Sequence, residues 1–256
     1  VGKAFGVVIV RIGEHGYEVA TFRKDYGYSD GRHPDAVIFS DPQMDAYRRD
    51  FTINALFFDP HAQKIYDFVN GKKDIENRTI RTVGNPDQRF EEDHLRMLRA
   101  IRFAFTFDFK FAPETISAIK RHACKIKRIS SERIQQELTR ILLESKKAGD
   151  AINCMQEVGL LEQILPEVDA LKGQDQPPQF HPEGDVFTHI IIMLNAQKEP
   201  SLQLAYAILL HDIGKPPTAK LVNGRIRFDN HARRGAVMAE EILRRLRMPL
   251  EDIKAI

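Results

Sequence analysis

Two periodicities of apolar residues divide the chain. In roughly the first eighty residues, apolar and β-branched residues alternate or follow one another in short runs, as in FGVVIVRI and YEVATFR, and the turn-rich DGRHPD comes after them. These runs predict β-strands, and FTINALFFD predicts a further strand or the entry to a helix. From about Arg89 the apolar residues recur at spacings of three and four, which predicts helices.

Helices are predicted in the middle of the chain over residues 91–105, 113–123, 130–144 and 148–158. In the third of these, Ser130 stands at the N-cap position. Its buried stripe is predicted to consist of Ile134, Leu138, Ile141 and Leu142. The Pro-, Gly- and Gln-rich stretch KGQDQPPQFHPEGD then predicts a loop or domain junction before a last helical block.

The predicted helix at EEDHLRMLRAIRF carries a polar column next to its apolar face. Asp93, Arg96, Arg99 and Arg102 recur at every third position. An Asp93–Arg96 pair is common on solvated helix faces and contributes only about 0.2–0.5 kcal/mol. Three arginines in one column repel one another, however, so the alternative interpretation is that the column binds an anion.

Composition narrows the class of protein. The chain has 256 residues, of which 43% are hydrophobic, enough for two or three small folded domains. Its longest apolar runs, VFTHIIIMLNA and LQLAYAILL, are far shorter than the roughly 20 residues that cross a bilayer, so no membrane span is expected. The two cysteines, Cys124 and Cys154, follow no metal-binding spacing; they are expected to be inert core thiols in a reducing cytoplasm.

Positive charge is concentrated in one segment. The net charge of the chain is only +2, yet KRHACKIKR, residues 120–128, contains six basic or potentially basic residues. A solvated helix face and a contact for a polyanion are both compatible with this segment.

Three segments, taken in order, resemble a known family. RRDFTINALFFD (residues 48–59), DFVNGKKD (67–74) and EEDHLRMLRAIRF (91–103) are similar to successive motifs of the class II tRNA nucleotidyltransferases, which include CCA-adding and A-adding enzymes and bacterial poly(A) polymerases. VGKAFGVV, YEVATFR and DGRHPD resemble the catalytic head of this family, and SSERIQQELTRILL resembles its neck, so the resemblance extends from Val1 to about Leu165.

The resemblance implies an α+β protein. A partial nucleotidyltransferase head, a small mixed sheet with helices, is expected over residues 1–88. An all-α neck for recognition of the nucleotide base and for RNA binding is expected over residues 89–172.

The resemblance also gives the polar column a role. Asp93 and Arg96 match the residues with which the family reads the base of the incoming nucleotide. A carboxylate only accepts hydrogen bonds and a guanidinium only donates them, so this pair suits the amine and the unprotonated ring nitrogen of cytosine or adenine, but not uracil or guanine. Arg99 and Arg102 match positions that help to hold the nucleotide, and Arg49 of RRD matches a further nucleotide contact.

In the family, a GG…VRD stretch and a D-x-D pair precede these motifs and hold two Mg²⁺ ions for phosphoryl transfer. Neither stretch occurs in this sequence. Both are expected upstream of Val1, so the sequence is interpreted as an internal fragment that is inactive alone. Glu18, on the YEVATFR strand, is either an additional catalytic carboxylate near the metal or an exposed strand glutamate.

A second set of residues lies in the last helical block, with His189 in VFTHIIIM, His211 and Asp212 in ILLHDIGKP, and His231 in FDNHARRGA. This set resembles the HD phosphohydrolase superfamily, whose helical sites bind a divalent metal, and such a domain follows the neck in a subgroup of the nucleotidyltransferases. The resemblance implies an incomplete all-α HD domain over residues 173–256, with His189, His211 and Asp212 as metal ligands. The aspartate that closes such a site is not identifiable before Ile256.

The expected function is the transfer of CMP, AMP or both from CTP and ATP to the 3′ end of an RNA, above all tRNA, with Mg²⁺ as cofactor and with the basic segment on the RNA backbone. Three alternatives remain open. They are a poly(A) polymerase of the same family, a metal-dependent HD phosphodiesterase or phosphatase with a vestigial head, and a non-catalytic RNA-binding module.

Overall fold

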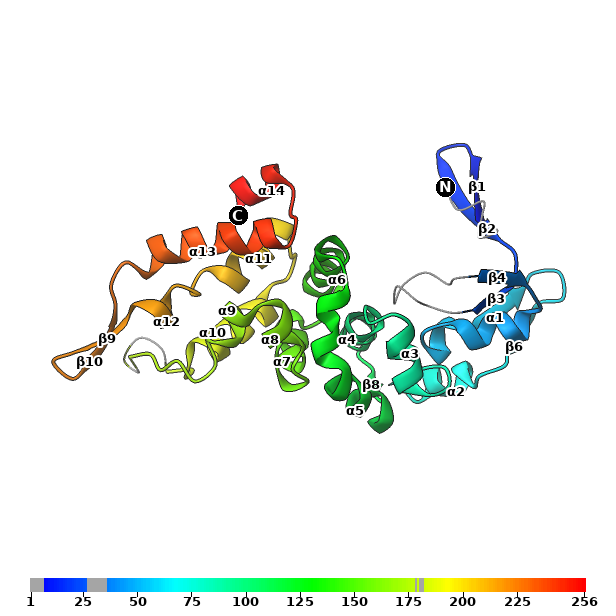
Figure 1. Ribbon diagram of the computed structural model, residues 1–256, viewed down its shortest axis with the longest axis horizontal. Coiled ribbons are helices and arrows are strands. Elements are labelled where there is room, and N and C mark those ends of the chain that lie inside the picture. The colour runs from blue at the N-terminus through cyan, green and yellow to red at the C-terminus, as the bar shows by residue number, and fades with distance from the viewer. Residues whose placement is uncertain (1–6, 27–35, 178, 180–181) are drawn as a thin grey trace. The chain divides into compact units, whose positions relative to one another are not determined.

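A computed structural model describes residues 7–26, 36–177, 179 and 182–256. The chain forms two compact units, Val1–Asp93 (unit 1) and His94–Ile256 (unit 2), whose elements are labelled in Figure 1. The predicted turn DGRHPD and the first six residues lie outside the described residues.

The described residues of unit 1 form three antiparallel strand pairs beside short helices, so the expected combination of small sheets and helices is confirmed, although these pairs do not join into one mixed sheet. The pairs are β1 (Val7–Ile12) with β2 (His15–Ala20), β3 (Arg23–Tyr26) with β4 (Ala36–Phe39), and β5 (Leu56–Asp59) with β6 (Lys64–Asp67). Gly13, with φ of +62°, lies in the tight turn between β1 and β2. The prediction of strands in this region is therefore confirmed, and the pairing within each hairpin is local.

The helices of unit 1 are short. They are α1 (Pro42–Arg48), the 3₁₀ turn η2 (Thr52–Asn54), α2 (Gly71–Glu76) and α3 (Pro86–Glu92), with the short strand β7 (Thr79–Ile80) between the last two. FTINALFFD accordingly forms a 3₁₀ turn followed by a strand. A small core of Ala46, Ala55 and Val83, with Phe57 and Phe68 against it, holds these elements together.

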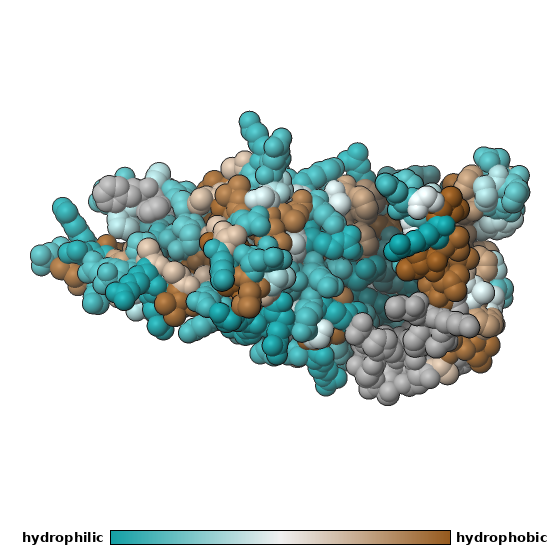
Figure 2. Space-filling view, turned by 90° about the horizontal axis from the view of Figure 1, so that it is seen from above, coloured by the Kyte–Doolittle hydropathy of each residue, from teal (hydrophilic) through white to brown (hydrophobic). Residues whose placement is uncertain are grey.

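The strands of unit 1 expose many apolar side chains. Ile9 is 60% exposed, Ile12 is 65% exposed and Phe39 is 67% exposed. Figure 2 shows hydrophobic side chains gathered over the end of the molecule that carries these strands. Large exposed apolar areas of this kind mark surfaces that other protein or ligand atoms cover.

Unit 2 is helical. Its first half contains α4 (Arg96–Phe107), β8 (Lys110–Phe111), α5 (Pro113–His122), the 3₁₀ segment η3 (Ala123–Arg128), α6 (Ser131–Glu144), α7 (Ala148–Glu157), α8 (Leu160–Ile164) and α9 (Pro166–Asp169). Its second half contains α10 (Val186–Ala196), α11 (Leu202–Leu210), α12 (Lys215–Thr218), the hairpin of β9 (Ala219–Val222) and β10 (Arg225–Phe228), α13 (His231–Arg245) and α14 (Leu250–Ala255).

Helix α6 has the core face predicted from its sequence. Ser130 is its N-cap residue, and all four residues of the predicted stripe are at most 8% exposed: Ile134, Leu138, Ile141 and Leu142. This face packs against α4 and α7, and α7 in turn packs against α10. At Gly149, helices α7 and α10 approach so closely that a Cβ on this residue would meet the carbonyl of Ile191. Asn195 and Asp150 join the same helices through hydrogen bonds of 3.2 and 2.8 Å.

The structure corrects two expectations. The helix predicted over residues 91–105 is wrong, because α3 ends at Glu92 and α4 begins at Arg96. Asp93 has extended backbone angles, φ −150° and ψ 106°, so it does not share a helix with the three arginines. Cys124 is exposed and is not a core thiol. Cys154 is half-buried, and burial raises the pKa of its thiol to about 12, which keeps it unreactive.

Within the described residues, no helix is both long enough and apolar enough to cross a bilayer.

Candidate nucleotide-binding and metal-binding sites

The double arginine of RRDFTINALFFD is held by a buried carboxylate. Asp45, 1% exposed, accepts hydrogen bonds from Arg48 Nε at 2.9 Å and from Arg49 Nε at 3.1 Å. Arg49 also donates from Nη1 to the carbonyl of Asn54 at 2.8 Å and lies 4.9 Å from the centre of the Phe57 ring. Arg49 is therefore a half-exposed guanidinium with a fixed orientation. Asp45 is not among the residues predicted from the sequence, although its i,i+3 and i,i+4 spacing to the two arginines is a signal for it.

The motifs RRDFTINALFFD and DFVNGKKD pack against each other. Asp74 accepts a hydrogen bond from Thr52 Oγ1 at 2.7 Å, and a Cβ on Gly71 would meet the carbonyl of Thr52. Asp67 accepts from backbone N–H groups of the DFVNGKKD loop, among them Gly71 N at 2.9 Å and Lys72 N at 2.9 Å. Burial raises the pKa of Asp67, but these hydrogen bonds outweigh it and lower the pKa below its ordinary value. The glycine and the aspartate of this motif thus shape the loop.

Asp93 is the last residue of unit 1, and Arg96 lies close to the start of unit 2. Asp93 is the half-buried C-cap residue of α3, and the side chain of Asn85, the N-cap residue of the same helix, accepts from Asp87 N at 2.8 Å. Arg96 is the first residue of α4 and is half-buried.

The two remaining arginines of α4 differ in environment. The side chain of Arg99 is 32% exposed and its guanidinium lies 5.3 Å from the ring centre of Phe103. Arg102 is only 3% exposed and donates from Nε to Glu137 at 2.8 Å, on α6. Glu137 also lies 3.9 Å from Arg99 Nη1. Arg102 is thus neutralised inside unit 2, whereas Arg99 reaches the surface.

Glu18, the candidate catalytic carboxylate, lies on β2 opposite Ile9 and is exposed. The described residues around it do not form a group of three or more candidate metal ligands. A site for two Mg²⁺ ions needs several convergent carboxylates. The part of unit 1 that the structure describes therefore does not fit such a site by itself.

The second candidate site brings together His189 from α10 with His211 and Asp212, which follow α11. One ligand atom from each lies within 4.8 Å of the others, and this is the one such group of three among the described residues. The residues predicted as metal ligands are thus close enough to share an ion. His231, the first residue of α13, adds Nε2 at 3.9 Å from Asp212 Oδ1. A Cβ on Gly214 would meet the carbonyl of His231, so the glycine of HDIGKP permits this approach.

Hydrogen bonds orient the three imidazole rings. Nδ1 of His211 lies 2.9 Å from the carbonyl of Ile208, and Nδ1 of His231 lies 2.7 Å from the carbonyl of Phe228. Because a carbonyl only accepts, each Nδ1 carries the proton. Nδ1 of His189 lies 2.6 Å from the Glu183 carboxylate, which favours the same tautomer. Metal-binding histidines are commonly held through Nδ1 in this way. Nε2 of His211 lies 3.1 Å from Asp212 Oδ2, so these two candidate ligands contact each other in the structure.

The charges at the cluster are balanced by a lysine. Lys215, 5% exposed, places Nζ 2.8 Å from Asp212 Oδ2 and 2.5 Å from Gln176 Oε1. Burial opposes ionisation of Asp212, but hydrogen bonds from His211 and Lys215 outweigh it and lower its pKa to about 2. Burial also lowers the pKa of His211, and the hydrogen bond to Asp212 outweighs it, so that this pKa is raised. A buried carboxylate that stays ionised, with imidazole nitrogens beside it, is a donor set that suits a divalent transition metal.

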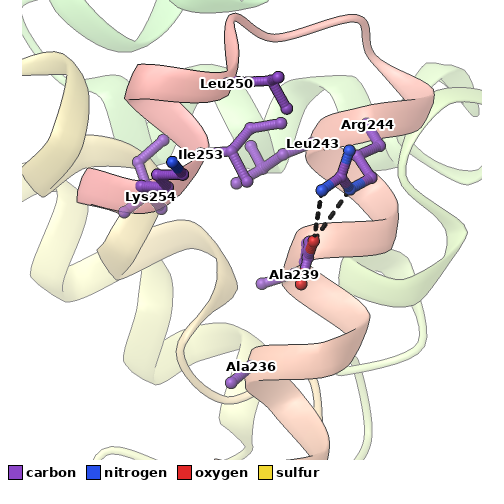
Figure 3. Close-up of a pocket in the computed structure, with 9 residues that line it drawn as sticks. Ala236, Ala239, Leu243, Arg244, Leu250, Ile253 and Lys254 are labelled. Atoms are coloured by element: carbon purple, nitrogen blue, oxygen red, sulfur yellow. Dashed lines mark hydrogen bonds and ion pairs between the residues drawn. The ribbon is translucent and has the colours of Figure 1, made fainter.

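A hollow of about 300 Å³ lies between α13 and α14 (Figure 3). Its walls are mainly apolar, from Ala236, Ala239, Leu243 and Ile253. The charged Arg244 at its rim is bound to Glu240 at 2.7 Å. This hollow therefore presents packing surface and does not carry convergent reactive groups.

Two protein families match the chain. Residues 1–81 match the poly A polymerase head domain, and residues 108–172 match the probable RNA and SrmB-binding site of polymerase A. The chain therefore belongs to the family of proteins that combine these two domains. Among its relatives are CCA-adding enzymes, so the family predicted from the sequence motifs is confirmed.

The CCA-adding enzyme of Lactobacillus helveticus is 38% identical over 209 residues, which are 77% of this chain and 50% of the relative. The CCA-adding enzyme of Staphylococcus aureus (strain MRSA252) is 46% identical over 143 residues, 56% of this chain and 36% of the relative. The crystal structure of the Bacillus stearothermophilus CCA-adding enzyme in complex with CTP has a TM-score of 0.67 at 28% identity and covers 99% of this chain and 53% of that one. The chain thus spans half or less of the length of the curated relatives.

Proposed function

We propose that the protein is a tRNA nucleotidyltransferase that adds CMP and AMP, from CTP and ATP, to the 3′ end of tRNA. The observation that carries this proposal is the 38% identity to the CCA-adding enzyme of Lactobacillus helveticus over 77% of the chain. The matches to a polymerase head domain and to an RNA-binding domain agree with it. The likeness to a structure that contains CTP supports the choice of nucleotide.

In this proposal Asp93 and Arg96 select the base. Together they offer acceptors on the carboxylate and donors on the guanidinium, the pattern that matches cytosine and adenine. Uracil and guanine present a carbonyl and a ring N–H at the same edge, which would leave one member of the pair without a hydrogen bond.

The arginines would hold the nucleotide phosphates. Arg49 and Arg99 are only partly exposed yet have fixed surroundings, which suits charge-assisted bonds to an anion. Arg102 belongs to the same proposal in an indirect role. Because its guanidinium is bound to Glu137 at 2.8 Å, it would act by positioning Glu137 and, through Glu137, Arg99.

The family uses a divalent metal, and we propose Mg²⁺, which would neutralise charge on the phosphoryl group during transfer. The described residues do not supply its full ligand set, and Glu18 is proposed only as an additional carboxylate near it. The tRNA backbone would lie on KRHACKIKR, where Lys120, Arg121, Lys127 and Arg128 are exposed. The free cysteines suit a reducing, cytoplasmic location.

An addition assay on the natural full-length protein tests the main proposal. A tRNA that lacks its 3′ CCA should gain two cytidines and one adenosine, and growth should stop there. A long adenosine tail would instead identify the poly(A) polymerase alternative. Retention of RNA without addition of any nucleotide would identify a binding module and refute the proposal.

A second function, a metal-dependent HD phosphodiesterase or phosphatase, is supported by one observation. Ligand atoms of His189, His211 and Asp212 lie within 4.8 Å of one another, and Nδ1 of each of the two histidines is held by a neighbouring acceptor. His211→Ala and Asp212→Ala should each abolish Mn²⁺ binding measured by calorimetry and should leave nucleotide addition intact, because the two sites lie on different elements. Equal metal content in wild type and variants would refute this site.

A further inference from the structure

The β9–β10 hairpin is a two-stranded projection that connects α12 to α13 (Figure 1). Its strands pair from Ala219 opposite Phe228 to Val222 opposite Arg225. Asn223 and Gly224 connect them with φ of +50° and +74°. Two successive residues with positive φ form the tight turn that matches strand twist. The hairpin therefore has a defined register.

This register places most apolar side chains on one face of the hairpin and the cationic side chains on the other. Because side chains alternate along a strand, Ala219, Leu221, Ile226 and Phe228 share one face. The other face carries Lys220, Val222, Arg225 and Arg227, so three of its four side chains are cationic.

The apolar face is the one that meets the rest of unit 2. The Phe228 ring lies 5.5 Å from Lys215 Nζ, and its centre is 6.4 Å from that of the His231 ring. Ile226 and Phe228 are half-buried, whereas Leu221 at the tip of this face is 75% exposed. On the other face Lys220, Arg225 and Arg227 are all exposed, and Lys220 also borders a hollow of about 250 Å³ next to residues 173–175.

The cations of this face lie close enough to repel one another. Lys220 stands directly opposite Arg227. Like charges at such cross-strand positions destabilise a hairpin. Asp229 compensates in part, at 3.0 Å from Arg227 Nη2. Residues 215–234 contain six Lys and Arg but one acidic residue, whereas the whole chain has a net charge of only +2. Positive charge is therefore concentrated at this hairpin and at the start of α13.

We infer that the cationic face of the β9–β10 hairpin, formed by Lys220, Arg225 and Arg227, binds the phosphodiester backbone of RNA. Arg225 and Arg227 stand about 6.6 Å apart along β10, with Lys220 opposite Arg227 on β9. Such an open row of cations suits successive phosphates of a polymer better than one small anion, which needs a closed pocket. Unit 2 also contains the family's RNA-binding domain. The inference rests on the RNA partner of the proposed function and adds a second contact outside that domain.

The test is RNA affinity measured by fluorescence anisotropy with a labelled tRNA that lacks its 3′ CCA. The variant combines Lys220→Gln, Arg225→Gln and Arg227→Gln. The control combines Lys198→Gln, Arg247→Gln and Lys254→Gln, three exposed cations elsewhere in unit 2, so that both proteins lose the same charge. We expect the hairpin variant to bind on the order of tenfold more weakly at about 0.1 M salt, with a salt slope smaller by about 2–3, and the control to change much less.

Equal losses in the hairpin and control variants would overturn the inference, because the effect would then be one of net charge. The inference would also be overturned, in favour of a small-anion site, if inorganic phosphate displaced the tRNA at a concentration equal to that of the phosphate groups of the tRNA. If the wild-type protein had no affinity for tRNA, the proposed function itself would fail. If the wild-type protein binds tRNA and the hairpin variant binds it with the same affinity, the inference about the hairpin is refuted while the proposed function stands.

Discussion

Glu137 is a nearly buried carboxylate that three guanidiniums approach. Arg102 is 2.8 Å away, Arg140 is 3.8 Å away and Arg99 is 3.9 Å away. The shortest of these contacts is also the most buried, since the Arg102 side chain is 3% exposed while that of Arg140 is 46% exposed. Desolvated ion pairs cost much more to break than exposed ones. The pair of Arg102 and Glu137 therefore sets the local structure, and Arg99 lies beside it with its side chain 32% exposed.

Replacing Arg102 with Met should lower the free energy of unfolding by about 3 kcal/mol, because the nearly buried Glu137 would lose its closest and most buried partner. Arg140→Met, the control, should cost at most about 1 kcal/mol. Urea denaturation followed by circular dichroism measures both values. The double variant Arg102→Met, Glu137→Met should recover part of the loss. Unchanged stability of Arg102→Met together with lost nucleotide affinity would instead mean that Arg102 contacts the nucleotide directly.

Helix boundaries decide which polar residues can act together. The predicted single helix over residues 91–105 is replaced by α3 and α4, which are separated at Asp93. Glu91 and Glu92 lie in the last turn of α3 and Asp93 is its C-cap residue, at the helix end where the dipole disfavours carboxylates. The sequence pattern alone therefore did not reveal that the helix ends there. By contrast, the stripe of α6 was predictable because its four apolar residues all face the core.

Helix α10, which carries His189, depends on its N-cap. Asp185 accepts hydrogen bonds from Thr188 N at 2.8 Å and from Gly173 N at 2.6 Å, so it also ties down the loop before the helix. Asp185→Ala should lower the free energy of unfolding by about 1–2 kcal/mol, and Asp185→Asn by less.

The effect of Asp185 should depend on pH with a known sign. Burial raises the pKa of Asp185, but its hydrogen bonds outweigh burial and lower the pKa below the ordinary value. A carboxyl group whose pKa is lower in the folded state stabilises the protein at pH values above its unfolded-state pKa, which is about 3.9. This contribution is lost as the pH falls through the folded-state pKa. The difference between wild type and Asp185→Ala should therefore be full at neutral pH and shrink below about pH 4. A difference that grows on acidification would contradict this assignment.

At the scale of the whole molecule, the two units differ in how far the sequence specifies them. Strand segments of unit 1 were recognisable from alternation, but the separation into three hairpin pairs depends on turns and pairings that single strands do not encode. The histidine cluster was predictable as a set of residues only through family resemblance. Its orientation by Glu183 and by two backbone carbonyls, and the salt bridge to Lys215, come from contacts between distant segments.

The central claim is that Asp93 and Arg96 make this protein select cytosine and adenine nucleotides. Titration calorimetry of the protein with CTP, ATP, UTP and GTP tests it most directly. Each good pair of base contacts is worth roughly 1–3 kcal/mol, so CTP and ATP should bind about tenfold or more tightly than UTP and GTP. Asp93→Ala and Arg96→Ala should each remove that preference. Equal affinity of the wild-type protein for all four nucleotides, or a preference that survives in both variants, would contradict the account.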